Sequence, residues 1–472
     1  MAKKNVLPVN KNDEITLKID SVTGQGCGVG RYKGLAVFVD GALKDEEVFA
    51  HIIKVKSNYA VAKLKSLLSP SKDRVDPLCS AYAQCGGCTL KHLSYQAQLE
   101  VKREQVKDAM ERLGGFRDIE VKPTIGMDEP VKYRNKGSFP FGICDGKIEV
   151  GFFKQRTHTL VPVAECDIQK SKVMEVAKTV RCWANRYNIQ PYDEESHEGI
   201  LRHVMARTNS DESEVMAVIV TTGPLPKVRE LTDMLREKVP ELVSIIHNVN
   251  KKDTNVILGN EFDVVWGSDT INETIDNIKF KVSAASFLQV NPLQTVKLYN
   301  AAIESLDLCG SKTVIDVFCG IGTMSLMIAK KAEQVIGIEI VREAINDARL
   351  NAAQNGIKNA EFICADAEEA LPKIVQSGVK IDCIMLDPPR KGCDEKTLMA
   401  IVESNAPQVA YVSCNPATLA RDCRILCDNG YVINSVQPVD MFPHSGHVES
   451  VVCLKRPTRQ LSSPKASEVA VQ

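Results

Sequence analysis

The chain of 472 residues is 44% hydrophobic, 25% charged and 5% aromatic, and its net charge is −1. This composition is typical of globular proteins, excludes a chain biased toward disorder, and at this length predicts two to four domains. No apolar run is long enough for a membrane span or a signal peptide, so we expect a cytoplasmic protein without a membrane partner. A net charge near zero gives no global sign of nucleic-acid binding, and any sign has to be local.

Residues 1–71 predict a small β-barrel. Five short β-forming segments lie between residues 14 and 65 and are separated by turns. Between residues 51 and 75, six Lys or Arg residues stand against one acid, which fits a solvated face and contacts with phosphates equally well. The stretch SPSKDRVDP, residues 69–77, is typical of a linker, and it places a domain boundary near residue 72.

Residues 72–283 are expected to form a central α+β domain. The run from Tyr95 to Leu113 contains good helix formers without Pro or Gly and is followed by two glycines, which predicts a helix within residues 93–115. Residues 120–280 alternate strand-like and helical stretches, and their order does not predict one topology.

Residues 284–456 predict a Rossmann-like domain, and residues 457–472 predict a disordered tail. Asn291 and Pro292 provide an N-cap and a first-turn residue for a helix. Beyond them, TVIDVF, QVIGIEI, AEFICAD, CIMLDPP and VAYVSC alternate with helical stretches. This alternation is the pattern of a doubly wound parallel sheet, so the whole chain is expected to be a multidomain α/β protein.

Three successive strand ends of this last domain carry the residues of a nucleotide cofactor site. Gly320 and Gly322 form a turn after the first strand, where backbone N–H groups can approach a ligand closely. Glu339 ends the next strand at the spacing of a carboxylate that binds ribose hydroxyls, and Asp366 ends the third, where it could accept from an adenine amino group. An adenosine-containing cofactor is therefore expected, and both NAD and S-adenosylmethionine satisfy this pattern.

The fourth strand ends in DPPR, Asp387 to Arg390. An acid followed by two prolines at a strand end is frequent in methyltransferases, and this favours S-adenosylmethionine. In enzymes that methylate exocyclic amines, an aromatic residue follows the prolines and the motif grips the amino group. Because Arg390 takes that place, the motif argues against an amine substrate without naming the methyl acceptor.

Cys414, in SCNPATLARD, ends the fifth strand just before a predicted helix. Addition of its thiolate to C6 of a uracil would turn C5 into an enolate carbon that can attack a methyl sulfonium. Open α/β sheets bind ligands at this edge, and the helix dipole is expected to favour the thiolate. The competing interpretation is that Cys414 is a small core residue.

Such a reaction also needs a base that removes the C5 proton, so that the enzyme leaves by β-elimination. Glu449, in SGHVESVVCL, is the best candidate, although it could equally be a surface carboxylate or a salt-bridge partner. His444 and His447 are alternatives from the same stretch.

The cysteines are distributed unevenly, with three of the sixteen inside ten residues: Cys79, Cys85 and Cys88. Three thiols in a glycine-containing loop can surround one metal centre, and Cys166 is a candidate for a distant fourth ligand. From the spacing alone, an iron–sulfur cluster and a tetrahedral zinc site are equally expected, and cysteines without a ligand are a third possibility.

Together these motifs resemble the RNA 5-methyluridine (uracil-C5) methyltransferases, most closely their 23S ribosomal RNA branch. The likeness covers nearly the whole chain: a TRAM-type, OB-like barrel at residues 12–70, then CSAYAQCGGC, YRNKGSFPF, SFLQVN, DVFCGIGTMSL, DPPRKG, SCNPATLARD and HVES. The resemblance implies an enzyme of class EC 2.1.1 that uses S-adenosylmethionine to convert a uridine of 23S ribosomal RNA to 5-methyluridine.

The resemblance also implies roles for particular residues, with Cys414 as the nucleophile and Glu449 as the base. It implies a [4Fe-4S] cluster on Cys79, Cys85, Cys88 and Cys166. It implies that S-adenosylmethionine is held by Gln289, Phe318, Thr323, Glu339, Asp366 and Asp387. Thr323 stands where some members of the family have Asn, and the helix at 93–115 is expected to pack on the catalytic domain.

The expected partner is 23S ribosomal RNA, and the chain is expected to act as a monomer without an obligate protein partner. A uracil within folded RNA has to be unstacked before a thiol reaches C6, so the enzyme should bind a splayed loop. Basic residues that could contact phosphates, or could equally be solvated, are Lys132, Arg134, Lys136, Lys154 and Arg156. The alternatives are the same chemistry on transfer RNA, an exocyclic-amine methyltransferase, and an RNA-binding iron–sulfur protein without methyltransferase activity.

Overall fold

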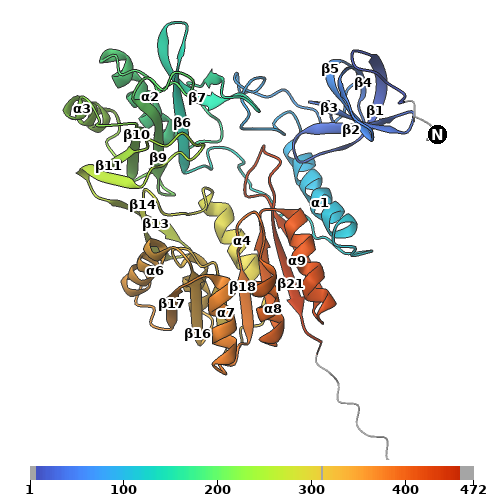
Figure 1. The fold of residues 1–472 in the computed structure, drawn as a ribbon, viewed down its shortest axis with the longest axis vertical. Coiled ribbons are helices and arrows are strands. Elements are labelled where there is room, and N and C mark those ends of the chain that lie inside the picture. The colour runs from blue at the N-terminus through green and yellow to red at the C-terminus, as the bar shows by residue number, and fades with distance from the viewer. Residues whose placement is uncertain (1–6, 310–311, 458–472) are drawn as a thin grey trace, which may run out of the picture.

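The computed structural model describes residues 7–309 and 312–457. Apart from Pro457, the tail expected at 457–472 lies outside the described residues. Figure 1 shows a barrel and a central sheet that both lie at one end of a larger α/β domain. In the described ranges, no helix is long and apolar enough to cross a membrane.

The N-terminal barrel is closed, with strand order β1-β2-β3-β5-β4. Its strands are β1 (Glu14–Val22), β2 (Cys27–Tyr32), β3 (Leu35–Asp40), β4 (Glu47–Val55) and β5 (Tyr59–Ser69). Alternate residues of β1 are buried, as expected for a strand with one face toward a core. Gly30 is required by close packing, because a Cβ there would lie 2.2 Å from the carbonyl oxygen of Lys18. The predicted small barrel is confirmed.

The linker after the barrel is attached to it by a buried ion pair. Arg74 donates from Nε to Oε1 of Glu46 (2.6 Å) and from Nη2 to Oε2 (2.9 Å), and Nη2 also reaches the carbonyl oxygen of Gly41 (2.7 Å). The Glu46 side chain is fully buried. This bidentate geometry holds the start of the second domain against the barrel wall.

The central region contains a seven-stranded sheet of order β12-β11-β10-β9-β6-β7-β8. Neighbouring strands are antiparallel except for β10 and β11, which are parallel and are joined through α3 (Val228–Lys238). Every residue of β10 is buried, which reflects its place in the middle of the sheet. The remaining elements are β6 (Lys136–Cys144), β7 (Lys147–Phe153), β8 (Leu160–Pro162), α2 (Ser171–Arg186), β9 (Leu201–Thr208), β10 (Val215–Thr221), β11 (Leu242–Val249) and β12 (Glu261–Gly267).

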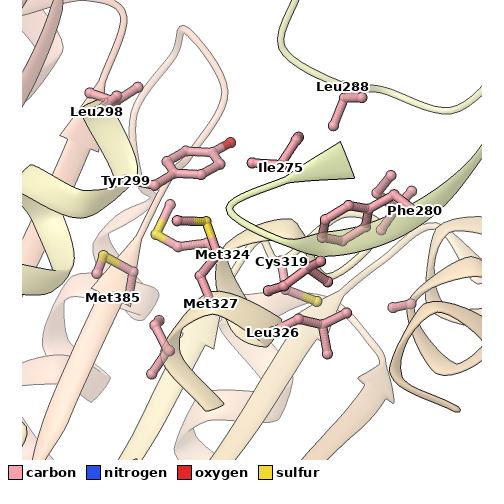
Figure 2. Packing of buried hydrophobic residues seen from close by; sticks show 14 of the residues in the cluster. Ile275, Phe280, Leu288, Leu298, Tyr299, Cys319, Met324, Leu326, Met327 and Met385 are labelled. Carbon is pink, nitrogen blue, oxygen red and sulfur yellow. The ribbon is translucent and has the colours of Figure 1, made fainter. Parts of the chain in front are cut away.

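A hairpin, β13 (Thr270–Ile275) and β14 (Ile278–Ser283), leads from the central region into the catalytic domain. The predicted boundary at residue 283 assigns it to the central domain, but it packs on α4 (Pro292–Ser305), α5 (Thr323–Ala329) and α6 (Arg342–Gln354). Figure 2 shows side chains of the hairpin, α4 and α5 meeting in one apolar cluster, among them Phe280, Tyr299 and Met324.

The catalytic domain contains a second seven-stranded sheet, of order β17-β16-β15-β18-β19-β21-β20. The five strands β17, β16, β15, β18 and β19 are parallel to one another, and β21 lies antiparallel between β19 and β20. The predicted doubly wound, Rossmann-like sheet is confirmed. Its other elements are β15 (Thr313–Val317), β16 (Gln334–Glu339), β17 (Ala360–Cys364), α7 (Ala367–Gln376), β18 (Cys383–Leu386), α8 (Glu395–Glu403), β19 (Gln408–Ser413), α9 (Pro416–Asp428), β20 (Val432–Val439) and β21 (Glu449–Lys455).

Helix α1 (Tyr95–Arg112) precedes the central sheet in sequence but packs on α9 and β20 of the catalytic domain. Figure 1 shows it below the barrel, alongside α9. Its buried positions, Gln98, Lys102, Val106 and Met110, recur every four residues and form the face toward that domain.

We predict that Glu46→Gln weakens the attachment of the linker, because it leaves Arg74 facing a buried site without its charge partner. The expected loss in free energy of unfolding is about 3 kcal/mol, measured by urea unfolding at neutral pH. The ion pair holds the pKa of Glu46 below its ordinary value of 4.5. Its contribution should therefore be complete above pH 4.5 and should disappear as the pH falls through the lowered pKa. Glu47→Gln, at the exposed neighbouring position, should leave the unfolding free energy unchanged; an equal loss there would contradict this assignment.

Candidate active site

The turn after β15 is shaped for close approach of a ligand to the backbone. Phe318 and Gly322 adopt left-handed conformations (φ 71° and 82°), and Gly322 is the N-cap of α5. The N–H groups of Phe318 and Cys319 donate to the carbonyl oxygen of Ile338, which ties the turn to β16. At Gly320 (φ 54°), a Cβ would meet nothing within 4 Å, so the backbone is open on that side. The turn therefore fits a cofactor cradle at the N-terminus of a helix.

Glu339, at the end of β16, lies against this turn. Its Oε2 accepts from the N–H of Gly320 (3.2 Å), and its Oε1 accepts from the N–H of Val341 (2.9 Å). Asp366 lies two residues beyond β17 and caps α7, accepting from the N–H of Glu368 (3.2 Å). Thr323 is the first residue of α5 and is buried. These side chains line successive strand ends, as the sequence predicts, and they fit an adenosine-containing cofactor.

Asp316, within β15, was missed by the sequence-based prediction. Its Oδ2 accepts from Ser325 Oγ (2.5 Å), and its Oδ1 is buried without a hydrogen-bond partner in the described structure. Burial raises the pKa of Asp316 to about 7. The available signal was an acid inside an otherwise apolar strand, which has to be bonded or functional when buried.

A second acid, Asp387, follows β18 at the same sheet edge. Burial, with a smaller effect of the Asp316 charge, raises the pKa of Asp387 to about 7. Gln289 and Tyr299 are both buried, and the pKa of the Tyr299 phenol is raised by burial and by the nearby charges of Asp387, Asp316 and Glu449. Tyr299 therefore joins the predicted site residues Gln289 and Asp387, although nothing in its sequence context distinguishes it from a core residue.

Cys414 lies between the last residue of β19 and the N-cap of α9. Asn415 is that cap and accepts from the N–H of Ala417 (3.1 Å), and Pro416 occupies the first turn. The pKa of the half-buried Cys414 thiol is raised, first by burial and then by the charge of Glu449, and Arg390 opposes the rise. Burial therefore works against the thiolate at this position, and the contribution of the α9 dipole stays a prediction.

Glu449 starts β21, directly beside the end of β19. The pairing of β19 with β21 ends at Ser413 and Ser450, so Cys414 and Glu449 are the next residues of the two segments, and the charge of Glu449 acts on the Cys414 thiol. The carboxyl is 3% exposed, and its pKa is raised well above the ordinary value by burial and by the charge of Asp387, with Arg390 acting in the opposite direction. The structure therefore brings the predicted nucleophile and the predicted base together at one sheet edge.

The two histidines of the same stretch differ from Glu449 in their surroundings. His444 is held by Gln98 of α1, whose Nε2 lies 3.3 Å from Nδ1, and burial lowers the pKa of His444 to about 4. His447 is exposed, and its ring lies edge-on to Phe442. Among these three, Glu449 is the group whose charge acts on the Cys414 thiol.

The four cysteines of the predicted metal site line one cavity of about 380 Å³, together with Lys91, Arg134 and Lys136. Burial and the charge of Cys166 raise the pKa of Cys88 to about 12, and Cys79 acts on the thiols of both Cys85 and Cys166, so the four side chains are neighbours. In residues 7–309 and 312–457, however, no three His, Cys, Asp or Glu side chains are already placed to hold a metal ion. Four cysteine thiols are suitable ligands for a thiolate-bound metal centre. In the described residues, however, their side chains are not arranged as the ligands of a bound metal ion.

Known proteins resemble this chain over almost its full length. A family model for tRNA (uracil-5-)-methyltransferases matches residues 94–457, and a TRAM domain model matches residues 8–65. An uncharacterized RNA methyltransferase of Halalkalibacterium halodurans is 47% identical over 453 residues (96% of this chain and 99% of the relative), and one of Clostridium tetani is 44% identical over 452 residues (96% and 98%).

Among solved structures, the tRNA (uracil-54, C5)-methyltransferase of Pyrococcus abyssi in complex with S-adenosyl-L-homocysteine superposes with a TM-score of 0.74 and 28% identity. The alignment covers 93% of this chain and 100% of that one. Because the matches include the entire catalytic domain, an RNA-binding protein without methyltransferase activity is not supported. The chain belongs to the tRNA (uracil-5-)-methyltransferase family, carries a TRAM domain, and is an S-adenosylmethionine-dependent RNA methyltransferase.

Proposed function

We propose that this enzyme methylates C5 of a uridine in 23S ribosomal RNA, through a covalent adduct between Cys414 and uracil C6. The observation that carries the mechanism is the pairing of β19 with β21, because Cys414 and Glu449 are the residues next to its last pair at the carboxyl edge of the sheet. A thiol and a buried carboxyl in this arrangement suit addition to C6 and later removal of a proton from C5.

The chain's own residues prepare the addition step. Cys414 has a raised pKa, so its proton has to leave as the uracil binds, and Arg390 is the nearby positive charge that favours the thiolate. The uracil then accepts the sulfur at C6, and the electron pair of the C5=C6 bond becomes available at C5. S-adenosylmethionine, held at the Gly320 turn and at Glu339 and Asp366, supplies the methyl group. Gln289, Phe318, Thr323 and Asp387 complete the proposed cofactor contacts.

The release step belongs to Glu449. Its carboxylate takes the C5 proton, the C–H electron pair restores the C5=C6 bond, and the C6–S bond breaks to return the Cys414 thiolate. Burial raises the pKa of Glu449, which strengthens it as a base for a weakly acidic C–H group.

The proposed target rests on domain composition. The resemblance of the barrel together with the cysteine loop is to the ribosomal RNA branch. The transfer RNA enzyme of Pyrococcus abyssi aligns with 93% of this chain, more than residues 72–472 alone, so the barrel by itself does not separate the two targets. The second candidate is a transfer RNA uridine, which the likeness to the Pyrococcus abyssi enzyme favours. In either case the proposed enzyme binds the RNA as a monomer in the cytoplasm.

We further propose that Cys79, Cys85, Cys88 and Cys166 hold a [4Fe-4S] cluster. Four thiols share one cavity, and Lys91, Arg134 and Lys136 beside them would offset the negative charge of a thiolate-bound cluster. The transfer of a methyl group needs no electrons from such a cluster, so its role here is structural, joining the loop that bears Cys79, Cys85 and Cys88 to the segment that bears Cys166.

Loss of 5-methyluridine from 23S ribosomal RNA is the expected result of deleting the gene, measured by mass spectrometry of digested ribosomal and transfer RNA. The wild-type gene should restore the nucleoside, and Cys414→Ala should not, because no thiolate can then add to C6. Cys364→Ala, at an exposed cysteine of the same domain, should restore it fully. Loss from transfer RNA alone would establish the second candidate. RNA containing 5-fluorouridine should trap the wild-type enzyme covalently, and an active enzyme that is not trapped would refute the adduct.

Alkylation of Cys414 by iodoacetamide should depend on pH in a way that reports on its neighbours. The charge of Glu449 raises the thiol pKa and that of Arg390 lowers it, so Glu449→Gln should move the midpoint to lower pH and Arg390→Gln to higher pH. Peptide mass spectrometry separates Cys414 from the other cysteines. Lys391→Gln, at the exposed neighbour of Arg390, serves as the control and should leave the midpoint in place; shifts in the reverse directions would refute the electrostatic account.

Protein purified without oxygen should contain about four iron and four sulfide per chain and should absorb in the visible range. Cys88→Ala should lose this absorption, and Cys309→Ala, at an exposed cysteine, should retain it. Stoichiometric zinc without iron in protein prepared this way would instead identify the site as a tetrahedral zinc centre.

A further inference from the structure

The loop between β20 and β21, residues 440–448, leads directly into Glu449; we refer to it as the base loop. Its polar groups bond mostly outside the Rossmann-like domain. The carbonyl oxygen of His444 accepts from the N–H of Leu90 (2.9 Å), and the N–H of His444 donates to Oε1 of Gln98 (2.9 Å). The carbonyl oxygen of Pro443 accepts from the hydroxyl of Tyr133 (2.9 Å).

The barrel also touches this loop. The N–H of Gly446 donates to Oγ1 of Thr89 (3.0 Å), next to the cysteine loop. A Cβ at Gly446 would lie 1.1 Å from the carbonyl oxygen of Gly24, in the turn between β1 and β2. The barrel, the cysteine loop and α1 therefore all reach the nine residues that precede the proposed base.

A buried ion pair anchors the start of the base loop. Lys102 of α1 and Asp440 are both 0% exposed, and Nζ lies 2.5 Å from Oδ1. Lys102 Nζ also donates to the carbonyl oxygen of Phe442 (3.0 Å), and Tyr95 donates to Oδ2 of Asp440 (2.8 Å). The backbone of Asp440 is held as well, because its carbonyl oxygen accepts from Gln294 (2.9 Å).

No other step of the proposed reaction uses this pair. Lys102 is fully enclosed, so it cannot contact RNA, and a buried ion pair is a costly way to join two elements that apolar residues could join. The pair has a defined geometry, because lysine donates to the carboxylate at close range, and it holds Asp440, which directly follows Val439, the residue of β20 that pairs with Glu449.

We propose that Lys102 is a positioning residue for Glu449, which it holds in place through Asp440 and the base loop. The inference rests on the proposed role of Glu449 in proton removal. Its consequence is that the release step depends on the docking of α1, an element that lies outside the Rossmann-like domain in sequence. Addition of Cys414 and methyl transfer do not use Glu449 as a base, so they should be much less sensitive to this docking.

The test uses the variant Lys102→Met, which keeps most of the length of the side chain without its charge. It measures covalent addition with methyl transfer separately from release of the product. With RNA and S-adenosylmethionine, the methylated covalent complex should accumulate, and its release should slow about tenfold or more. Trapping by RNA containing 5-fluorouridine should keep its wild-type rate within about twofold, since trapping precedes proton removal. Both are read on denaturing gels after rapid quenching.

A general loss of structure would change both rates together, and three further proteins distinguish it from a positioning effect. Lys102→Arg keeps the charge and should recover most of the release rate. Gln98→Leu removes the bond to His444 without disturbing the ion pair and should slow release in the same direction by a smaller factor. Arg74→Met removes a comparable pair in the barrel and should leave release unchanged.

The inference is refuted if Lys102→Met and Gln98→Leu both release product at the wild-type rate. It is equally refuted if trapping and release slow by the same factor in either variant. If the wild-type enzyme forms no covalent complex with RNA at all, the proposed adduct fails, which is a separate result.

Discussion

The antiparallel insertion of β21 between β19 and β20 is the constraint on which the proposed chemistry depends. Side chains in a β-sheet change faces with a shift of one residue, so register decides which groups meet. Here Ser413 pairs with Ser450, and Cys414 and Glu449 are the residues next to this last pair. β21, the last strand along the chain, thus carries a carboxyl near the cysteine that follows β19 at the same edge of the sheet.

Burial controls the electrostatics of this edge. Asp316 and Glu449 are buried and Asp387 is partly buried, and each has a raised pKa because its charged form is poorly solvated. The same effect raises the pKa of Cys414. Burial therefore favours the uncharged forms of these acids and of the thiol, and the positive charge of Arg390 opposes this effect at Cys414 and Glu449. A bound substrate whose polar edge lies beside these groups changes the pKa of each of them.

The parts outside the Rossmann-like domain contribute more than RNA contacts. Helix α1 packs on α9 and β20, the linker is attached to the barrel through Arg74 and Glu46, and the base loop meets the barrel at Gly446. The four cysteines, three in one loop and Cys166 in a distant segment, line one cavity. The barrel, the cysteine loop and α1 therefore all contact the loop that leads into Glu449 at the carboxyl edge of the sheet.

The sequence by itself determined the features that depend on neighbouring residues. The small barrel, the alternation of strands and helices, the glycine turn at Gly320 and the cap at Asn291 all follow from periodicity and turn chemistry, and they were predicted correctly. The nucleophile and base were predicted from motifs and resemblance, and their roles remain proposals. Only the tertiary structure decided the direction of the pKa shift of Cys414, the burial and raised pKa of Asp316 and Tyr299, and the contact of Lys102 with Asp440. Lys102 looks like a surface residue of a polar helix, and its partner lies 338 positions along the chain. Desolvation and long-range pairing arise from how the whole chain packs, and no local pattern encodes them.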